Sequence, residues 1–157
     1  MNYVSYPTDC GDALLHFLSR SQTVRIRGLQ LQTELISPND YDYKFLKFVS
    51  LKGCKLVLPD ISNKVSPKRL ELSEYYDTKK IFDFRRIEEL DIRSAHMETY
   101  LSQVENDLLN LKILRVFDIV VISNTFQKIF SYFERLNQGI VLQRFDVYRF
   151  IGNPRDC

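Results

Sequence analysis

The chain has 157 residues, of which 45% are hydrophobic and 27% are charged. These proportions are typical of one globular domain and exclude a chain that is disordered throughout. The formal net charge of +2 is too small to indicate a nucleic-acid or membrane partner by itself.

Other features of the sequence bear on its compartment. No apolar run approaches the roughly 18 residues that a transmembrane helix needs. Residues 1–7 lack the basic start and the apolar stretch of a secretory signal. The three cysteines, Cys10, Cys54 and Cys157, are scattered and odd in number, which favours reduced thiols. We therefore expect an intracellular protein of the cytoplasm or nucleus, with no membrane partner.

The first expected element is a short capping helix within residues 1–20. Thr8 or Asp9 can serve as its N-cap. The residues expected to face the core are spaced as on one side of a helix. They are Ala13, Leu14, Phe17 and Leu18. We expect this helix to cover the edge of the first strand or the core beside it.

Six segments downstream share an apolar-x-apolar pair, and each is predicted to be a short strand. The first residues of these pairs stand at positions 24, 49, 70, 90, 114 and 145, so successive pairs are 25, 21, 20, 24 and 31 residues apart. Such a period indicates a repeat fold in which each unit stacks on the next. An ordinary α/β domain with recurring strands is the alternative.

The best copy of the repeat, residues 46–56, reads L-x-x-V-x-L-x-x-C-x-L. Three other copies carry the extra apolar residue three positions before the pair, at Ile87, Leu111 and Leu142. This pattern resembles the leucine-rich-repeat superfamily over about residues 21–150. Five copies lack the Asn or Cys of the turn. In this irregularity the chain is similar to the repeat region of F-box proteins.

The resemblance implies an α/β fold: a short solenoid, or horseshoe, with about six parallel strands on its concave side and helices or loops outside. It also implies one domain over residues 1–157. Residues 1–20 would form the capping helix, residues 21–150 about six irregular repeats, and residues 151–157 a tail.

The connections between parallel strands must cross over the sheet. Residues 97–109 and 123–139 are predicted to form helices because their apolar residues recur every three or four positions. In the first these are Tyr100, Leu101, Val104, Leu108 and Leu109; in the second they are Phe126, Ile129, Phe130, Phe133 and Leu136. Residues 77–84 allow about two helical turns. Residues 33–43 and 56–67 hold prolines and are expected to be loop or extended chain.

The sequence contains no recognisable catalytic, zinc-binding or phosphate-binding motif. His16 is expected to be structural within the first helix, His96 to lie in an exposed turn, and Cys54 to be buried in a turn. Glu71 and Asp91 can approach each other on neighbouring strands, as carboxylate pairs do in acid–base enzymes. Nearby arginines favour ion pairs instead, so we expect no enzyme, no cofactor and no metal. A hydrolase is the alternative, and it would need raised carboxylate pKa values.

Alternation along the strands would send the residues between the apolar ones to the concave face, in three rows. The first row is Thr23, Phe48, Arg69, Glu89, Ile113 and Arg144. The central row is Arg25, Ser50, Glu71, Asp91, Arg115 and Asp146. The third row is Arg27, Lys52, Ser73, Arg93, Phe117 and Tyr148. Side chains on neighbouring strands are close enough to pair. The expected ion pairs are Arg69–Glu89, Asp91–Arg115 and Arg115–Asp146.

We expect this face to bind a protein partner, because arginine mixed with aromatic residues is typical of interface hot spots. The candidate partner-binding residues are Arg25, Phe48, Arg69, Asp91, Arg93, Arg115, Phe117 and Tyr148. The resemblance to F-box proteins implies substrate recognition for a ubiquitin ligase. The alternative is nucleic-acid or chromatin-associated binding through residues 44–86, where eleven Lys or Arg face five Asp or Glu, a local charge of +6.

Overall fold

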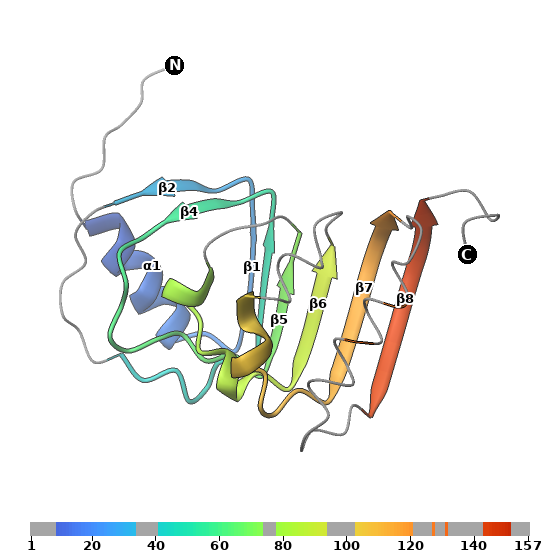
Figure 1. Cartoon of the computed structure of the whole chain (residues 1–157). Coiled ribbons are helices and arrows are strands. Elements are labelled where there is room, and N and C mark those ends of the chain that lie inside the picture. Colours follow the sequence, from blue (N-terminus) through green and yellow to red (C-terminus); the bar gives the residue numbers. More distant parts are fainter. Residues whose placement is uncertain are drawn as a thin grey trace.

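A six-stranded parallel sheet dominates the computed structural model, which describes residues 9–33, 41–73, 78–93, 103–120, 127, 131 and 143–151. Its strand order is β1-β3-β5-β6-β7-β8. The bounds are β1 Thr23–Arg27, β3 Phe48–Lys52, β5 Arg69–Leu72, β6 Glu89–Arg93, β7 Ile113–Val120 and β8 Arg144–Ile151. The sheet is open, with β1 and β8 at its two ends (Figure 1). The prediction of an α/β fold with about six parallel strands is confirmed.

All six strands pair in one register. The first residue of each apolar pair lies beside its counterpart on the next strand, as in Val49↔Leu70, Leu70↔Leu90 and Leu90↔Leu114. A slip of one residue would turn every apolar side chain of a strand to the opposite face of the sheet. The spacing of the pairs therefore predicted the alignment of the strands correctly.

The core lies on the side of the sheet to which these pairs point. Val49, Leu70, Leu90 and Leu114 are fully buried there. The second member of each pair continues the same layer, and Leu51, Leu72, Ile92 and Val116 are also buried. Most of the strand residues that build the core are thus the ones that the apolar-x-apolar pattern identifies.

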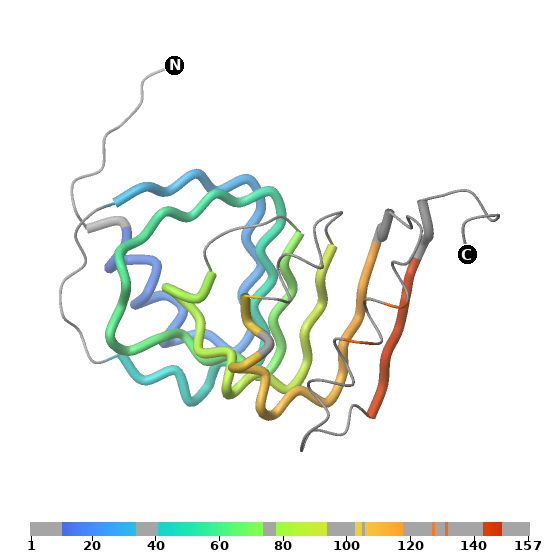
Figure 2. Tube along the Cα trace, viewed as in Figure 1, coloured from blue at the N-terminus to red at the C-terminus, as the bar shows by residue number. Residues whose placement is uncertain are grey.

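A second, two-stranded sheet follows the first two strands and was not predicted. β2 (Gln30–Gln32) pairs in parallel with β4 (Lys55–Val57). Gly28 and Gly53 adopt positive φ angles of 65° and 59°, a backbone conformation that glycine adopts without steric cost. They stand at the corners between β1 and β2 and between β3 and β4. Two successive turns of the chain therefore follow the same path (Figure 2).

Cys54 is fully buried at the second of these corners. Its Sγ lies 3.4 Å from the carbonyl oxygen of Ile26 and 3.5 Å from that of Lys52. The thiol thus reaches the backbone of the preceding chain turn at Ile26. The prediction of a buried turn cysteine is confirmed.

The N-terminal helix α1 (Asp9–Ser19) lies near β1 and far from β8 (Figure 1). Leu15 and Leu18 join the core that contains Val24 of β1. The predicted inward face was partly wrong, because Ala13 is exposed and 56% of the Phe17 surface is exposed. The helix buries the stripe centred on Leu15 and Leu18, one turn apart, rather than the one through positions 13 and 17.

His16 of α1 is exposed rather than packed among the helix leucines. Its ring makes an edge contact with Tyr41, with the centroids 5.7 Å apart. His16 therefore lies within the first helix, as expected, with its ring at the surface against Tyr41.

The helices that the sequence predicts between the strands differ from the observed elements where the structure describes them. In the predicted helix 97–109, Gln103 and Val104 are helical and a 3-10 turn, η3 (Glu105–Asp107), follows. Val104 and Leu108 are buried as expected, but Leu109 is 56% exposed. Its inward placement was wrong, because the α-helical spacing does not continue through the tighter 3-10 turn.

Residues 77–84 were expected to form about two helical turns. The structure has two separate 3-10 turns here, η1 (Thr78–Lys80) and η2 (Phe84–Arg86). In the predicted helix 123–139, Gln127 and Ser131 are described; both are helical, and the Ser131 hydroxyl donates to the Gln127 carbonyl at 2.7 Å. The remainder of that helix, residues 97–102, His96 and the tail from 152 onward lie outside the described residues. Cys10 lies in α1.

We predict that Leu90→Ala lowers the free energy of unfolding by about 2–5 kcal/mol, because it leaves a cavity in the centre of the core. The matched control is Leu109→Ala, the same truncation at a mostly exposed leucine, with an expected change below about 0.5 kcal/mol. Urea unfolding measures both. Equal losses for the two variants would contradict the observed core.

Candidate functional site

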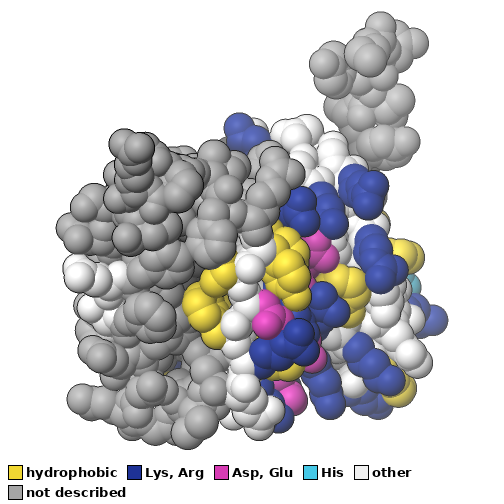
Figure 3. Space-filling view, turned by 90° about the vertical axis from the view of Figure 1, so that its right-hand side faces the viewer, with side chains coloured by type: hydrophobic (Ala, Val, Ile, Leu, Met, Phe, Trp, Pro, Cys, Tyr) yellow, Lys and Arg dark blue, Asp and Glu magenta, His cyan; other side chains and the backbone are white. Residues whose placement is uncertain are grey.

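The side of the sheet opposite the core carries the candidate site, and we call it the strand face. It consists of the outward residues of β1, β3, β5, β6, β7 and β8. The register places Thr23, Phe48, Arg69, Glu89, Ile113 and Arg144 in one row, as predicted. It likewise aligns Arg25, Ser50, Glu71, Asp91, Arg115 and Asp146. Figure 3 looks toward this side, where basic side chains surround a few acidic and hydrophobic ones.

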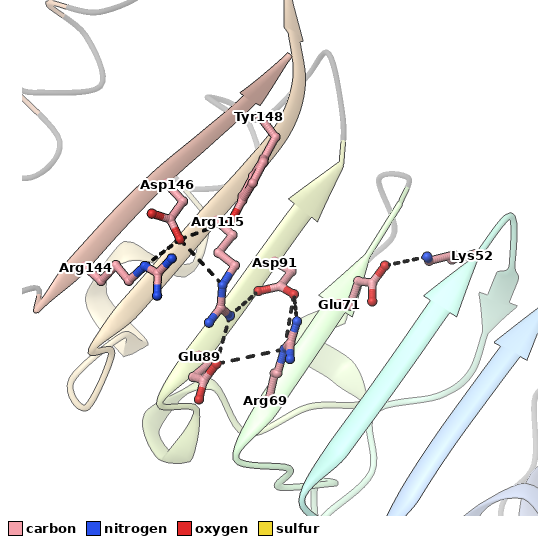
Figure 4. A network of polar contacts seen from close by, with 9 residues as sticks. All are labelled: Lys52, Arg69, Glu71, Glu89, Asp91, Arg115, Arg144, Asp146 and Tyr148. Atoms are coloured by element: carbon pink, nitrogen blue, oxygen red, sulfur yellow. Dashed lines mark hydrogen bonds and ion pairs between the residues drawn. The ribbon is translucent and has the colours of Figure 1, made fainter. Parts of the chain in front are cut away.

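An ion-pair network occupies the middle of the strand face (Figure 4). We define it as Arg69, Glu89, Asp91, Arg115 and Asp146. The three predicted pairs are present, with N–O distances of 4.0 Å for Arg69–Glu89, 3.0 Å for Arg115–Asp91 and 3.8 Å for Arg115–Asp146. Two further ion pairs join diagonal neighbours in the register: Arg69–Asp91 at 2.5 Å and Arg115–Glu89 at 2.8 Å. Their N–O distances are shorter than those of the three predicted pairs. Long arginine side chains reach a diagonal neighbour as easily as an opposite one.

Asp91 is the buried centre of this network. Only 1% of its side chain is exposed, and each carboxylate oxygen has an arginine donor. Oδ2 accepts from Arg69, and Oδ1 accepts from Arg115. A buried charge is tolerated when it is paired and hydrogen-bonded in this way. Asp91 therefore holds the two arginines in place, whereas the sequence had suggested it as a residue that touches a partner.

Arg115 is itself mostly buried, with 15% of its side chain exposed. This burial alone would lower its pKa, but hydrogen bonds to Glu89 and Asp91 outweigh it and raise the pKa of Arg115 above its ordinary value. These contacts therefore favour the charged form of the guanidinium. The middle of the strand face consequently carries charged side chains that are held by one another.

Phe48 lies between two arginines at the β1 end of the strand face. The guanidinium carbon of Arg25 is 5.2 Å from the centroid of the Phe48 ring, and that of Arg69 is 4.8 Å away. Both distances are within the range of cation–π attraction. The ring and the two cations therefore form one stacked group across β1, β3 and β5.

A second aromatic group lies toward the β8 end. The rings of Phe117 and Tyr148 stack with centroids 4.6 Å apart and planes 9° from parallel. Arg93 lies over the Phe117 ring at 4.9 Å, and 42% of Tyr148 is exposed. We call these three residues the aromatic platform. The sequence predicted that they share a row but not that they stack.

The two carboxylates that suggested acid–base chemistry are separated by their partners. Glu71 pairs with Lys52 at 2.8 Å, while Asp91 pairs with Arg69 and Arg115. Each carboxylate thus has its own basic partner.

A polar pocket of about 320 Å³ lies away from the strand face and was missed by sequence reasoning. It gathers Lys64, Lys79, Arg85 and Arg86 from segments on either side of β5. Asp107 pairs with Lys79 at 3.0 Å and with Arg85 at 3.8 Å across it. Several basic side chains of residues 44–86 therefore line this pocket and do not belong to the strand face.

Comparisons with protein-family models, curated proteins and solved structures find no match to this chain. In the described residues no helix is long and apolar enough to cross a membrane. Within the same part of the chain, His, Cys, Asp and Glu side chains form no group of three or more that could hold a metal ion. The strand face is therefore interpreted from its own geometry.

We predict that Asp91→Ala lowers the free energy of unfolding by about 3 kcal/mol, because it leaves Arg115 buried with one partner fewer. This value is the lower end for a broken buried pair, since Glu89 and Asp146 still contact Arg115. The control is Asp60→Ala, whose side chain is 73% exposed and pairs only along the surface with Lys64, with an expected change below about 0.5 kcal/mol. Thermal or urea unfolding compares them. A neutral Asp91→Ala variant would refute the anchoring role of this carboxylate.

Proposed function

We propose that the chain is a non-enzymatic binding module that holds another protein on its strand face. The observation that carries this proposal is the aromatic platform, in which an exposed tyrosine stacks on Phe117 beside Arg93. Tyrosine and arginine are enriched among residues that dominate binding energy. Side chains already fixed by stacking also lose less conformational entropy when a partner binds.

We further propose that the chain is a short solenoid of the irregular leucine-rich-repeat type, with the strand face as its concave side. The single register of six parallel strands and the repeated glycine corner support this assignment. So does the buried Cys54 at the turn position of the best copy. In this proposal residues 21–150 form the repeats of one domain.

Substrate recognition for a ubiquitin ligase, in the cytoplasm or nucleus, is a narrower form of the same proposal. It rests on the resemblance of the irregular repeats to those of F-box proteins. Ligase subunits recovered together with the partner from cells would support it. A partner whose ubiquitination is unchanged when the chain is removed would count against it.

Nucleic-acid binding through residues 44–86 has less support. Lys52 and Arg69 lie on the strand face, but Lys64, Lys79 and Arg86 line the separate pocket. A nucleic-acid site needs basic side chains gathered along one face or groove. The local charge of +6 is instead divided between different surfaces.

We predict that Arg93→Glu combined with Tyr148→Ala weakens partner binding about 30-fold or more, because it removes two of the three residues of the platform. The partner is first captured from a cell extract with the unaltered chain, then purified and titrated by calorimetry. Thermal unfolding should change little, since neither residue belongs to the core.

The matched control is Arg85→Glu combined with Leu109→Ala. It reverses one exposed arginine and truncates one exposed apolar residue outside the strand face. It should bind the partner as the unaltered chain does. If both double variants bind equally well, or lose binding equally, the strand face is not the binding site.

A further inference from the structure

The two ends of the strand face differ in charge. β1 and β3 contribute Arg25, Arg27 and Lys52 to it and no acidic residue. With β5 the total becomes four basic side chains against one acidic, since Arg69 and Glu71 are added. The other three strands contribute three acidic and three basic side chains: Glu89, Asp91, Asp146, Arg93, Arg115 and Arg144. The surplus of +3 thus lies entirely over β1, β3 and β5.

Arg25 and Arg27 carry the part of this surplus that is open to a partner. Both are exposed, and no carboxylate of the described residues forms an ion pair with either of them. The guanidinium carbon of Arg25 lies over the Phe48 ring, 5.2 Å from its centroid, and this cation–π contact restricts the positions that the guanidinium can take. A guanidinium held in this way suits bidentate hydrogen bonds to a carboxylate.

The β8 end offers a different chemistry. Its charges balance, and its exposed feature is the stacked pair Phe117 and Tyr148. An aromatic face of this kind buries apolar or aromatic side chains. The centre of the ion-pair network between the two ends is buried, since Asp91 is 1% and Arg115 is 15% exposed, whereas Arg69 is 38% exposed. The middle of the strand face is therefore less accessible than its two ends, which differ in chemistry.

The register gives the separation of the two ends. Arg25 and Phe117 are four strands apart in the order β1-β3-β5-β6-β7 and two residues apart along the strand direction. With ~4.8 Å between strands and ~3.3 Å per residue, this is a diagonal of roughly 20 Å. An extended peptide covers that distance with about six residues.

We propose that the partner of the strand face is an extended peptide segment with acidic residues over Arg25 and Arg27 and an aromatic or large apolar residue about six positions away on the Phe117–Tyr148 pair. This inference rests on the proposed function and names the chemistry of its partner. Opposite charge draws the acidic end to β1, and the aromatic contact determines where along the strand face the segment binds.

The test is a selection of random 12-residue peptides displayed on phage, with the full chain as bait. The unaltered chain is expected to enrich peptides that pair acidic residues with an aromatic residue about six positions apart. Arg25→Glu combined with Arg27→Glu should weaken the binding of a synthetic enriched peptide about tenfold or more in fluorescence anisotropy. Arg27→Glu alone, which leaves the Arg25–Phe48 stack in place, should give a smaller loss in the same direction.

The control is Arg85→Glu combined with Arg86→Glu, which changes the net charge equally on 3-10 turn η2 and should leave peptide binding unchanged. Equal weakening by this control would show that net charge alone acts, and it would overturn the inference. Enriched peptides without acidic residues that still depend on Arg93 and Tyr148 would overturn the acidic partner while leaving the proposed function intact. Tighter binding of a mixed-sequence single-stranded oligonucleotide at the same salt concentration would overturn both.

Discussion

The inner strands β3, β5, β6 and β7 each bury two apolar residues with one residue between them, and most of the structure depends on this constraint. In parallel strands the two buried positions fix the register, because any slip by one residue exposes both of them. The same register then places every intervening residue on the strand face and determines its neighbours. Side chains along each strand point alternately to the two faces of the sheet, so the same pattern produces the core on one face and the candidate site on the other.

The register also buries a charged group in the ion-pair network, which is energetically unfavourable. The central row places a carboxylate, Asp91, where neighbouring side chains cover it almost completely. Removing a charge from water is unfavourable, and the attraction of two arginines offsets that cost without a large net gain in stability. What the network does provide is order, because Arg69 donates two hydrogen bonds to Asp91 and Arg115 donates to both Glu89 and Asp91. Charges with fixed positions favour one partner over others more than they increase affinity.

The parts of the molecule that sequence reasoning predicted are those controlled by period-two alternation. The six strands, their order and the rows of the strand face follow from the spacing of the apolar pairs, and opposite-strand ion pairs follow from the rows. The diagonal pairs and the stacked aromatic rings could not be predicted, because they depend on side-chain rotamers rather than on register. β2 and β4 were missed because three residues are too few to show alternation. The inward side of α1 was placed incorrectly because Ala13 and Phe17 fit a helical stripe nearly as well as Leu15 and Leu18 do.

The same geometry is the reason why we propose binding for this surface. Catalysis on a carboxylate or a histidine needs a group whose protonation can change near neutral pH and whose reactive atom is open to a substrate. On the strand face the most buried carboxylate accepts from two arginines, and the other described carboxylates also have basic partners. The side chains open to solvent include the Arg25 guanidinium over the Phe48 ring and the tyrosine stacked on Phe117. We propose that this surface, whose charged centre is paired and whose two ends differ in chemistry, recognises an extended chain by its charge at one end and its shape at the other.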